Sequence, residues 1–137
     1  MTTDLEVLGL EVKRAQYRNH RTMDAALHDV GITLVQWDAL RAIERMPGGS
    51  GHDLAVATFQ SDQSFGALAT RLMDRGLVTR SAGRGRRLEY ALTDSGRAAL
   101  EDGYDVARGV LHDLFAPLDE TQRAELLRTL RLLTADA

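Results

Sequence analysis

Residues 61–93 read SDQSFGALATRLMDRGLVTRSAGRGRRLEYALT, and this stretch decides the fold. Its first part predicts a helix over 62–75, because apolar residues recur there at i, i+3, i+7 and i+8: Phe65, Leu68, Leu72 and Met73. Gly76 then ends the helix, since glycine most readily adopts the left-handed backbone of a C-cap. Two strand-like runs follow, 77–81 and 88–92, joined by a turn that holds two glycines and three arginines. A helix followed by an arginine-tipped hairpin is typical of a winged helix-turn-helix, which makes DNA binding the leading hypothesis.

The composition indicates a single cytoplasmic domain. A chain of 137 residues, 44% of them hydrophobic, can build a core, since folding at this size removes roughly two-thirds of the unfolded chain's surface from water. Its apolar runs are far shorter than the ~20 residues that span a bilayer. The acidic N-terminus lacks the basic and apolar regions of a signal peptide. Because there is no cysteine, disulfides, thiolate zinc sites and thiol-based redox sensors are excluded.

The charge is unevenly distributed along the chain. The net charge is −3, but residues 63–93 hold six arginines against Asp74 and Glu89, a local balance of +4, so the remainder carries −7. Positive charge gathered in one segment with acidic flanks is expected of a DNA-binding module. The alternative interpretation is an arginine-rich face that is only solvated.

Two shorter helices are predicted before this stretch. Thr33 and Gln36 have the T-x-x-Q form of a capping box, in which the two residues satisfy backbone donors reciprocally. Ser50 and Asp53 form a weaker cap of the same kind. The helix that they open, over 50–58, is expected to pair with the helix described first as a helix-turn-helix.

Long helices are expected at both ends of the chain. Residues 4–30 contain no proline and predict one helix, which is longer than a small core can cover. After Thr93, which caps the next helix, a heptad seam typical of a helix that packs along a partner runs through Leu100, Tyr104, Ala107, Leu111 and Leu114. Asp119 opens a final amphipathic helix. We therefore expect a homodimer whose interface includes Leu5, Leu8, Val12, Leu111, Leu114, Leu126, Leu130 and Leu133.

These elements predict a mainly α fold with a small β-hairpin. A winged helix-turn-helix core is flanked by long N- and C-terminal dimerisation helices. Residues 34–93 are the expected DNA-binding region, and residues 1–33 and 94–137 are the expected helical dimerisation region of one continuous domain.

The order and spacing of these motifs resemble the MarR (multiple antibiotic resistance regulator) family of bacterial transcription factors. The resemblance is carried by Ile32-Thr33 with Gln36-Trp37, by Asp53-Leu54-Ala55, by Arg71 through Arg80, and by Leu92-Thr93-Asp94-Ser95-Gly96-Arg97. It covers nearly the full length, because the acidic, leucine-rich terminal helices match the family's dimerisation arms. It implies a homodimeric repressor on a pseudo-palindromic DNA operator, with half-sites about one helical turn apart, ~34–36 Å.

The wing departs from the family pattern. The family wing usually carries D-x-R, in which the aspartate orients the arginine that enters the minor groove. Aligned back from Leu92-Thr93, Arg86 falls on the family arginine, whereas Arg84 occupies the place of the aspartate. The wing therefore keeps its positive charge without the residue that holds the arginine in position, and we expect looser contact with phosphate.

Helical geometry leaves the face opposite the apolar stripe of 62–75 free to enter the major groove of DNA. Its polar and small side chains suit the groups on base edges, and its first turn suits phosphate. Three wing arginines are expected to flank or enter the minor groove, where narrow A·T tracts deepen the negative potential. First-turn capping and a flexible basic loop are the alternatives. The predicted DNA-binding residues are Ser61, Gln63, Ser64, Ala67, Thr70, Arg71, Arg84, Arg86 and Arg87.

The resemblance also implies a ligand cavity where the dimer arms meet the winged helix, often for phenolic or other aromatic acids. The candidates here are Tyr17, His20, Trp37 and Arg41, an aromatic wall with a base that holds an anion. The alternative is that Trp37 belongs to the core and that His20 is solvated. No cofactor or metal is expected, because the four histidines are scattered and form no H-E-x-x-H motif.

Two other classes of protein compete with a DNA-binding regulator. An enzyme is disfavoured because no catalytic or metal-binding cluster is found in the sequence. A winged helix that docks on a partner protein, without an effector or strong DNA binding, is the main alternative. RNA binding is disfavoured because Tyr90 is the only aromatic residue near the basic turn, and a strand can bury it.

Overall fold

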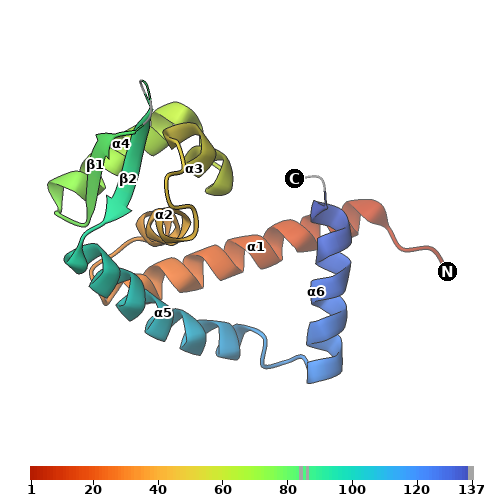
Figure 1. Ribbon diagram of the computed structural model, residues 1–137. Helices are drawn as coiled ribbons and strands as arrows, with labels where there is room; N and C mark the ends of the chain where they lie inside the picture. Colours follow the sequence, from red (N-terminus) through yellow and green to blue (C-terminus); the bar gives the residue numbers. More distant parts are fainter. Residues whose placement is uncertain (84, 86, 136–137) are drawn as a thin grey trace.

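The computed structural model describes residues 1–83, 85 and 87–135, and it has the predicted mainly helical architecture with one hairpin (Figure 1). The predicted wing residues Arg84 and Arg86 lie outside the described residues. In chain order the elements are α1 (Leu5–His28), α2 (Leu34–Arg45), α3 (Gly51–Ala57), α4 (Asp62–Asp74), β1 (Val78–Ala82), β2 (Leu88–Leu92), α5 (Asp94–Leu114) and α6 (Glu120–Thr134).

A polar side chain caps the start of each of these helices and thereby sets its first residue. The six caps are Asp4, Thr33, Ser50, Ser61, Thr93 and Asp119, and each accepts a hydrogen bond from a backbone N–H of the first turn. Both predicted capping boxes are confirmed, because Thr33 with Gln36 and Ser50 with Asp53 bond reciprocally. Such caps contribute about 1 kcal/mol each.

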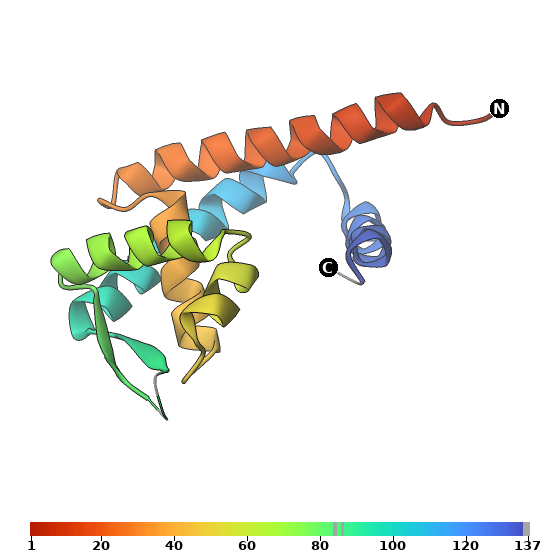
Figure 2. The same cartoon turned by 90° about the horizontal axis from the view of Figure 1, so that it is seen from above.

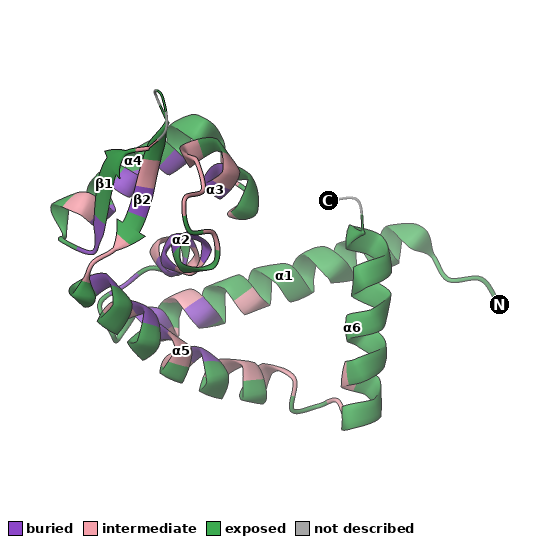
Figure 3. Ribbon diagram, viewed as in Figure 1, coloured by how far each residue is buried: buried purple, intermediate pink, exposed green. Residues whose placement is uncertain are grey.

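The core surrounds α2, which lies between the other helices of the winged-helix part (Figures 1 and 3). Four residues of α2 that recur at every third position face inward and are buried: Leu34, Trp37, Leu40 and Ile43. From α4, the predicted stripe of Phe65, Leu68 and Leu72 is buried against this core, while Met73 is partly buried. The apolar stripe in the sequence of residues 61–93 therefore correctly predicted which face of α4 points outward.

The hairpin begins one residue later than predicted. The N–H of Leu77 donates to the carbonyl of Leu72, 3.0 Å away, and so completes the C-terminal turn of α4 instead of joining the sheet. The antiparallel strands then pair from Val78 with Leu92 to Ala82 with Leu88. Tyr90 of β2 is buried and meets the ring of Phe65 edge to face, with the ring centroids 5.8 Å apart. This contact fastens the wing to α4.

The heptad seam of α5 was expected to pack along a partner, and in its first half that expectation is wrong. Leu100 and Ala107 are buried within this chain, in a helix that contacts α1 and α2. Leu111 and Leu114, further along, are only partly buried. Heptad spacing indicates that a helix is packed, but it does not say whether the partner belongs to the same chain.

Two helical arms extend from this core. In Figures 1 and 2, α6 stands away from the winged-helix part, and Figure 3 shows it and the N-terminal half of α1 as exposed. No residue of α6 is buried, and Leu5 of α1 and Leu133 of α6 are 76% and 70% exposed. Apolar surface on this scale is unusual for a monomer. Among the described residues, no helix is both long and apolar enough to cross a membrane.

Candidate nucleic-acid interface

The outward face of α4 carries the side chains that the sequence predicted for it. Gln63, Ser64, Ala67, Thr70 and Arg71 are all exposed, on the side of the helix opposite its buried stripe. The hydroxyl of Thr70 donates to the carbonyl of residue 66, 3.1 Å away, which leaves its methyl group and the oxygen's remaining lone pairs for another molecule. This face is long enough for an approach to base edges.

Because residue 66 is glycine, no side chain projects from the middle of this face. A side chain built at Gly66 would find open space within 4 Å, so nothing inside the protein requires glycine there. Glycine inside a helix costs roughly 0.5–1 kcal/mol relative to alanine. A glycine on this exposed helical face leaves room for another molecule to approach the backbone closely.

The first turn of α4 is a cluster of polar groups. Ser61 accepts from the N–H of Ser64 at 3.1 Å, and the two hydroxyls lie 3.0 Å apart. Nearby, Nδ1 of His52 on α3 is 2.9 Å from Oδ1 of Asp62. The hydrogen bond and charge of Asp62 raise the pKa of His52 above its ordinary value. The sequence did not point to this pair, since ten residues separate its members without a periodic relation.

The turn between α3 and α4 contains a residue with an unfavourable backbone conformation. Phe59 has φ of +58°, the left-handed region that favours glycine, and its side chain is 92% exposed. The turn is nevertheless well hydrogen-bonded, because Gln60 donates to Ala55 and Phe59 to Val56, the pattern of a Schellman motif. The turn between the two helices of the helix-turn-helix therefore carries phenylalanine at a position whose backbone conformation favours glycine.

The far end of α4 is fastened to the connection between α1 and α2. Arg75 donates to the carbonyl of Gly31 at 2.8 Å and to Oε1 of Gln36 at 3.0 Å. Gln36 already accepts from the N–H of Thr33 in the capping box. The backbone carbonyl that Arg75 meets therefore belongs to the segment that follows α1.

Of the three predicted wing arginines, Arg87 is among the described residues, and its side chain points toward the protein. Nη2 of Arg87 lies 2.6 Å from the carbonyl oxygen of Gly48 and 3.3 Å from Oδ2 of Asp53. The pKa of Asp53 is lowered, chiefly by the backbone and hydroxyl hydrogen bonds of Ser50 and to a smaller extent by the charges of Arg87 and His52. Sequence analysis predicted Asp53 as a cap and Arg87 as a DNA contact, but it did not predict their contact.

Two of the four predicted ligand residues come together near the base of the arms. Trp37 is buried, donates from Nε1 to the carbonyl of Leu100 at 3.1 Å, and meets Tyr104 edge to face at 5.2 Å. The guanidinium of Arg41 lies 4.6 Å from the centroid of Trp37. Its Nε atom is buried and has no hydrogen-bond partner among the residues that the structure describes.

An acidic group joins this cluster. Nη1 of Arg41 is 3.3 Å from Oδ1 of Asp38. Burial raises the pKa of Asp38, and the charges of Arg41 and of the predicted ligand residue His20 partly oppose the shift. Tyr17 is placed differently, since it is exposed and lines a separate hollow of about 440 Å³ on α1. In the described chain, Tyr17 therefore lies apart from the cluster of Trp37 and Arg41.

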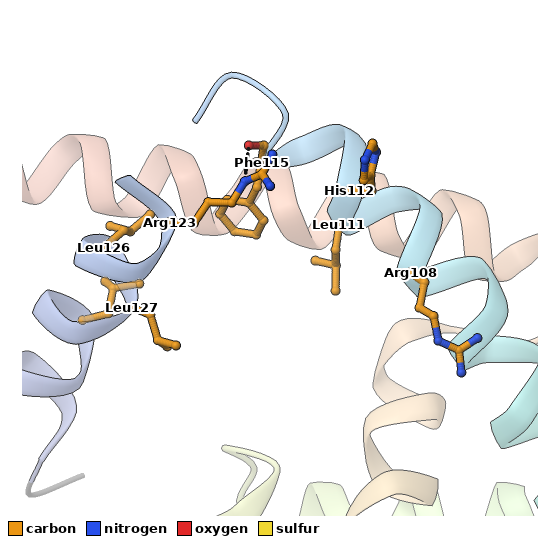
Figure 4. A pocket seen from close by; sticks show the side chains of 8 residues that line it. Arg108, Leu111, His112, Phe115, Arg123, Leu126 and Leu127 are labelled. Atoms are coloured by element: carbon orange, nitrogen blue, oxygen red, sulfur yellow. Dashed lines mark hydrogen bonds between the residues drawn. The ribbon is translucent and has the colours of Figure 1, made fainter. Parts of the chain in front are cut away.

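An apolar groove lies between α5 and α6. It has a volume of about 500 Å³, and Figure 4 shows side chains of α5 and α6 on its two sides, with Arg123 reaching the carbonyl of Phe115. Its lining includes three of the predicted dimer residues, Leu111, Leu126 and Leu130. The predicted residues Leu5, Leu8 and Val12 are exposed on α1.

Comparison with known proteins agrees with this architecture. Residues 30–87 match the family model described as "MarR family". The "HTH-type transcriptional repressor Rv2887" of Mycobacterium tuberculosis is 33% identical over 116 residues, which cover 83% of this chain and 84% of that protein. A solved structure of Rv2887 in complex with p-aminosalicylic acid is similar with a TM-score of 0.77 and 31% identity, covering 93% of this chain and 98% of that one. Rv2887 in complex with DNA is similar with a TM-score of 0.75 and 28% identity, covering 92% and 96%.

Proposed function

This chain belongs to the MarR family, and from that premise we propose that it is a transcriptional repressor that binds double-stranded DNA sequence-specifically. We propose further that it acts in the cytoplasm as a homodimer and has no enzymatic activity. The support from relatives is direct, because the similar Rv2887 is called a repressor and has been solved in complex with DNA.

The observation that carries this function is the two-sided character of α4. On one side of α4, Phe65, Leu68 and Leu72 are buried in the core, which fixes the rotation of the helix about its own axis. The other side is fully exposed and has no bulky apolar residue over its length. A fixed helix with a polar, low outer face is what entry into the major groove requires, since base edges are read by hydrogen bonds and methyl contacts.

The predicted DNA-binding residues of α4 can each take a matching role on DNA. Gln63 can pair with both exposed groups of adenine, Arg71 with guanine or a phosphate, and Thr70 and Ala67 with the methyl group of thymine. The serines at the start of α4, Ser61 and Ser64, suit phosphate at the positive end of the helix. Their mutual hydrogen bond holds both hydroxyls at this end before DNA arrives.

The dimer follows from the exposed arms. Leucines of α6 and the N-terminal half of α1 expose apolar surface that no other part of the chain covers within the described residues. We propose that residues 1–33 and 94–137 form the dimer interface and that residues 34–93 contact DNA. A two-fold dimer presents two copies of α4, which predicts half-sites about one helical turn apart.

A small aromatic or anionic effector is proposed to release the repressor. The similar Rv2887 was solved in complexes with p-aminosalicylic acid and salicylic acid. Arg41, with its buried and unpaired Nε over the ring of Trp37, is the cation best placed in the described chain for an aromatic acid. Such a ligand would shift the spacing of the two α4 helices only if it bound one spacing more tightly.

The test is a titration of the purified protein with a selected operator and with random duplexes. Arg71→Ala and Gln63→Ala are expected to weaken operator binding by roughly tenfold each, since a good bidentate base contact is worth about 1–3 kcal/mol. Arg128→Ala is the charge-matched control, because this exposed arginine lies on α6, away from the winged-helix part. Since α6 belongs to the proposed dimer interface, this variant and the native protein are compared at a concentration where both are dimeric. A native protein that binds no duplex at low salt would contradict the function and favour a protein-docking winged helix.

A further inference from the structure

The wing root is joined to the helix-turn-helix by a three-part contact. Arg87 closes the hairpin through its backbone, since its carbonyl accepts from the N–H of Gly83 at 2.7 Å. Its side chain then crosses to the helix-turn-helix, where it donates to Gly48 before α3 and approaches Asp53 in the first turn of α3. We name the contact among Arg87, Gly48 and Asp53 the wing clasp.

Both acceptors of the wing clasp are fixed independently of the wing. The carboxylate of Asp53 accepts from the N–H of Ser50 at 3.1 Å in the capping box, which sets its direction. Gly48 has φ of +75°, a conformation that favours glycine and that orients the turn after α2. Neither acceptor needs Arg87 in order to be in place, so the arginine meets a preformed site.

The packing next to the clasp brings the same two parts together. The hydroxyl oxygen of Tyr90 on β2 lies 3.8 Å from the position of a side chain at Gly51, the first residue of α3. A side chain at Gly48 would likewise lie 3.8 Å from the carboxylate of Glu89 on β2. The wing strand thus lies beside the start of α3, and Arg87 adds a directed polar contact between the two.

The clasp gives the wing a carboxylate partner from outside its own sequence, for the neighbouring residue Arg87. In the family pattern the wing's own aspartate orients the arginine, and here position 84 holds arginine instead. The carboxylate that meets a wing arginine comes from Asp53, thirty-four residues earlier in the chain. A guanidinium paired with a carboxylate and a carbonyl has its charge largely compensated, so it is poorly suited to neutralise a phosphate.

We propose that Asp53 and Arg87 are positioning residues that hold the wing at a fixed distance from α4 before DNA binds, which presupposes the DNA-binding function proposed above. The wing and α4 must enter adjacent grooves of one duplex together. Fixing their relative position in the free protein removes an ordering cost from binding. Arg87 therefore contributes to affinity through the placement of the wing and not through contact with DNA.

The decisive variant is Asp53→Asn, because the two possible roles of Arg87 predict opposite signs for it. Asparagine keeps an oxygen for the N–H of Ser50 but loses the charge that attracts Arg87. If the clasp positions the wing, Asp53→Asn weakens operator binding although it removes a negative charge beside DNA. Since an exposed ion pair contributes little and a dimer has two clasps, we expect a loss of roughly twofold to thirtyfold.

The clasp also predicts a pattern across variants. Arg87→Gln is expected to lose at least as much affinity as Asp53→Asn, because it also loses the hydrogen bond to Gly48. The double variant should lose no more than Arg87→Gln alone, because the carboxylate then has no arginine to hold. The dependence of affinity on salt should stay at the native slope. Ser50→Ala is the matched control, since it removes the cap hydroxyl but keeps the carboxylate, and it should bind the operator like the native protein.

The opposite pattern would overturn the proposal. If Arg87 contacts phosphate, Asp53→Asn binds the operator as well as or better than the native protein. Arg87→Gln then loses affinity and lowers the salt slope by roughly one charge per subunit.

A measurement without DNA keeps this proposal separable from the proposed function. Amide hydrogen exchange of the free protein reports on the N–H of Gly83, which is bonded to the carbonyl of Arg87. The clasp predicts several-fold faster exchange there in Asp53→Asn, with unchanged exchange in α4. Unchanged exchange at Gly83 would refute the clasp even if the protein binds DNA, and faster exchange would support it even if no duplex is bound.

Discussion

Replacing Gly103 with alanine is expected to destabilise the protein strongly, although it adds a single methyl group. Gly103 is buried on α5 directly against the indole of Trp37. A methyl carbon at this position would lie 2.2 Å from Nε1 and 2.3 Å from Cδ1 of that ring. The indole cannot stay where it is, and the hydrogen bond from its Nε1 to the carbonyl of Leu100 cannot survive the displacement.

The magnitude of the stability loss follows from two destabilising contributions and one stabilising contribution. Overpacking a well-packed core costs typically 1–3 kcal/mol, that is about 2 kcal/mol. Leaving the indole N–H or the Leu100 carbonyl buried without its partner costs a further ~1–3 kcal/mol. Alanine regains about 1 kcal/mol over glycine in a helix. The net expectation is a loss of about 3 kcal/mol in the free energy of unfolding, a large share of the roughly 5–15 kcal/mol of a typical native protein.

Urea unfolding followed by tryptophan fluorescence measures this loss of stability, and the signal comes from the displaced ring itself, because Trp37 is the only tryptophan of the chain. Native and variant proteins must be compared at one concentration, since the midpoint of a dimer depends on it. Gly66→Ala is the matched control: the added methyl meets nothing within 4 Å, so it should stabilise α4 by about 0.5–1 kcal/mol. A Gly103→Ala protein as stable as the control would refute the contact between α5 and Trp37.

Three further substitutions test separate features. Phe59→Gly should raise the unfolding free energy by up to about 1 kcal/mol, because glycine tolerates the positive φ of this turn. A decrease of about 1 kcal/mol in the same urea assay would instead show that the aromatic ring makes a stabilising contact. His52 has a pKa raised by Asp62, so their pair stabilises the fold fully below the ordinary pKa of 6.5 and loses this effect as the pH rises through the folded pKa. His52→Gln should flatten the pH dependence of the urea midpoint in that window, and a native-like profile would count against the pair. Arg75→Ala should lower the unfolding free energy by about 1 kcal/mol, since two hydrogen bonds to the α1–α2 connection are lost. Arg80→Ala, an exposed arginine on β1, should leave it unchanged, and equal losses in both would deny Arg75 its role.

Local sequence patterns predicted those parts of the fold that local physics controls. The capping pairs Thr33 with Gln36 and Ser50 with Asp53 act over three residues, so their spacing in the sequence is the spacing of the contact. The apolar stripe of α4 likewise acts within one helix and correctly left Gln63 and Arg71 outside. Helix starts and the outer face of α4 could be predicted for that reason.

Contacts between distant segments could not be predicted in this way. Arg75 reaches a carbonyl 44 residues away, and Arg87 reaches one 39 residues away. Nothing in the spacing of an arginine indicates which way its long, flexible side chain will turn. Gly103 had no explanation in the sequence for the same reason, because its cause is the ring of Trp37 on another helix.

These long-range contacts change what the arginine count means for DNA binding. Residues 63–93 hold six arginines, but Arg75 and Arg87 are engaged by carbonyl and side-chain oxygens of the protein. If all six neutralised a phosphate in each subunit of a dimer, this segment alone would give a salt slope of roughly −11; with four it would give roughly −7. Non-specific binding is almost wholly electrostatic, so arginines that fix position reduce it without removing a base contact. Operator titrations between about 50 and 200 mM salt distinguish the two slopes. If the double variant Arg75→Gln with Arg87→Gln lowers the native slope by about four, both arginines leave their protein partners when DNA binds; an unchanged slope means that they stay.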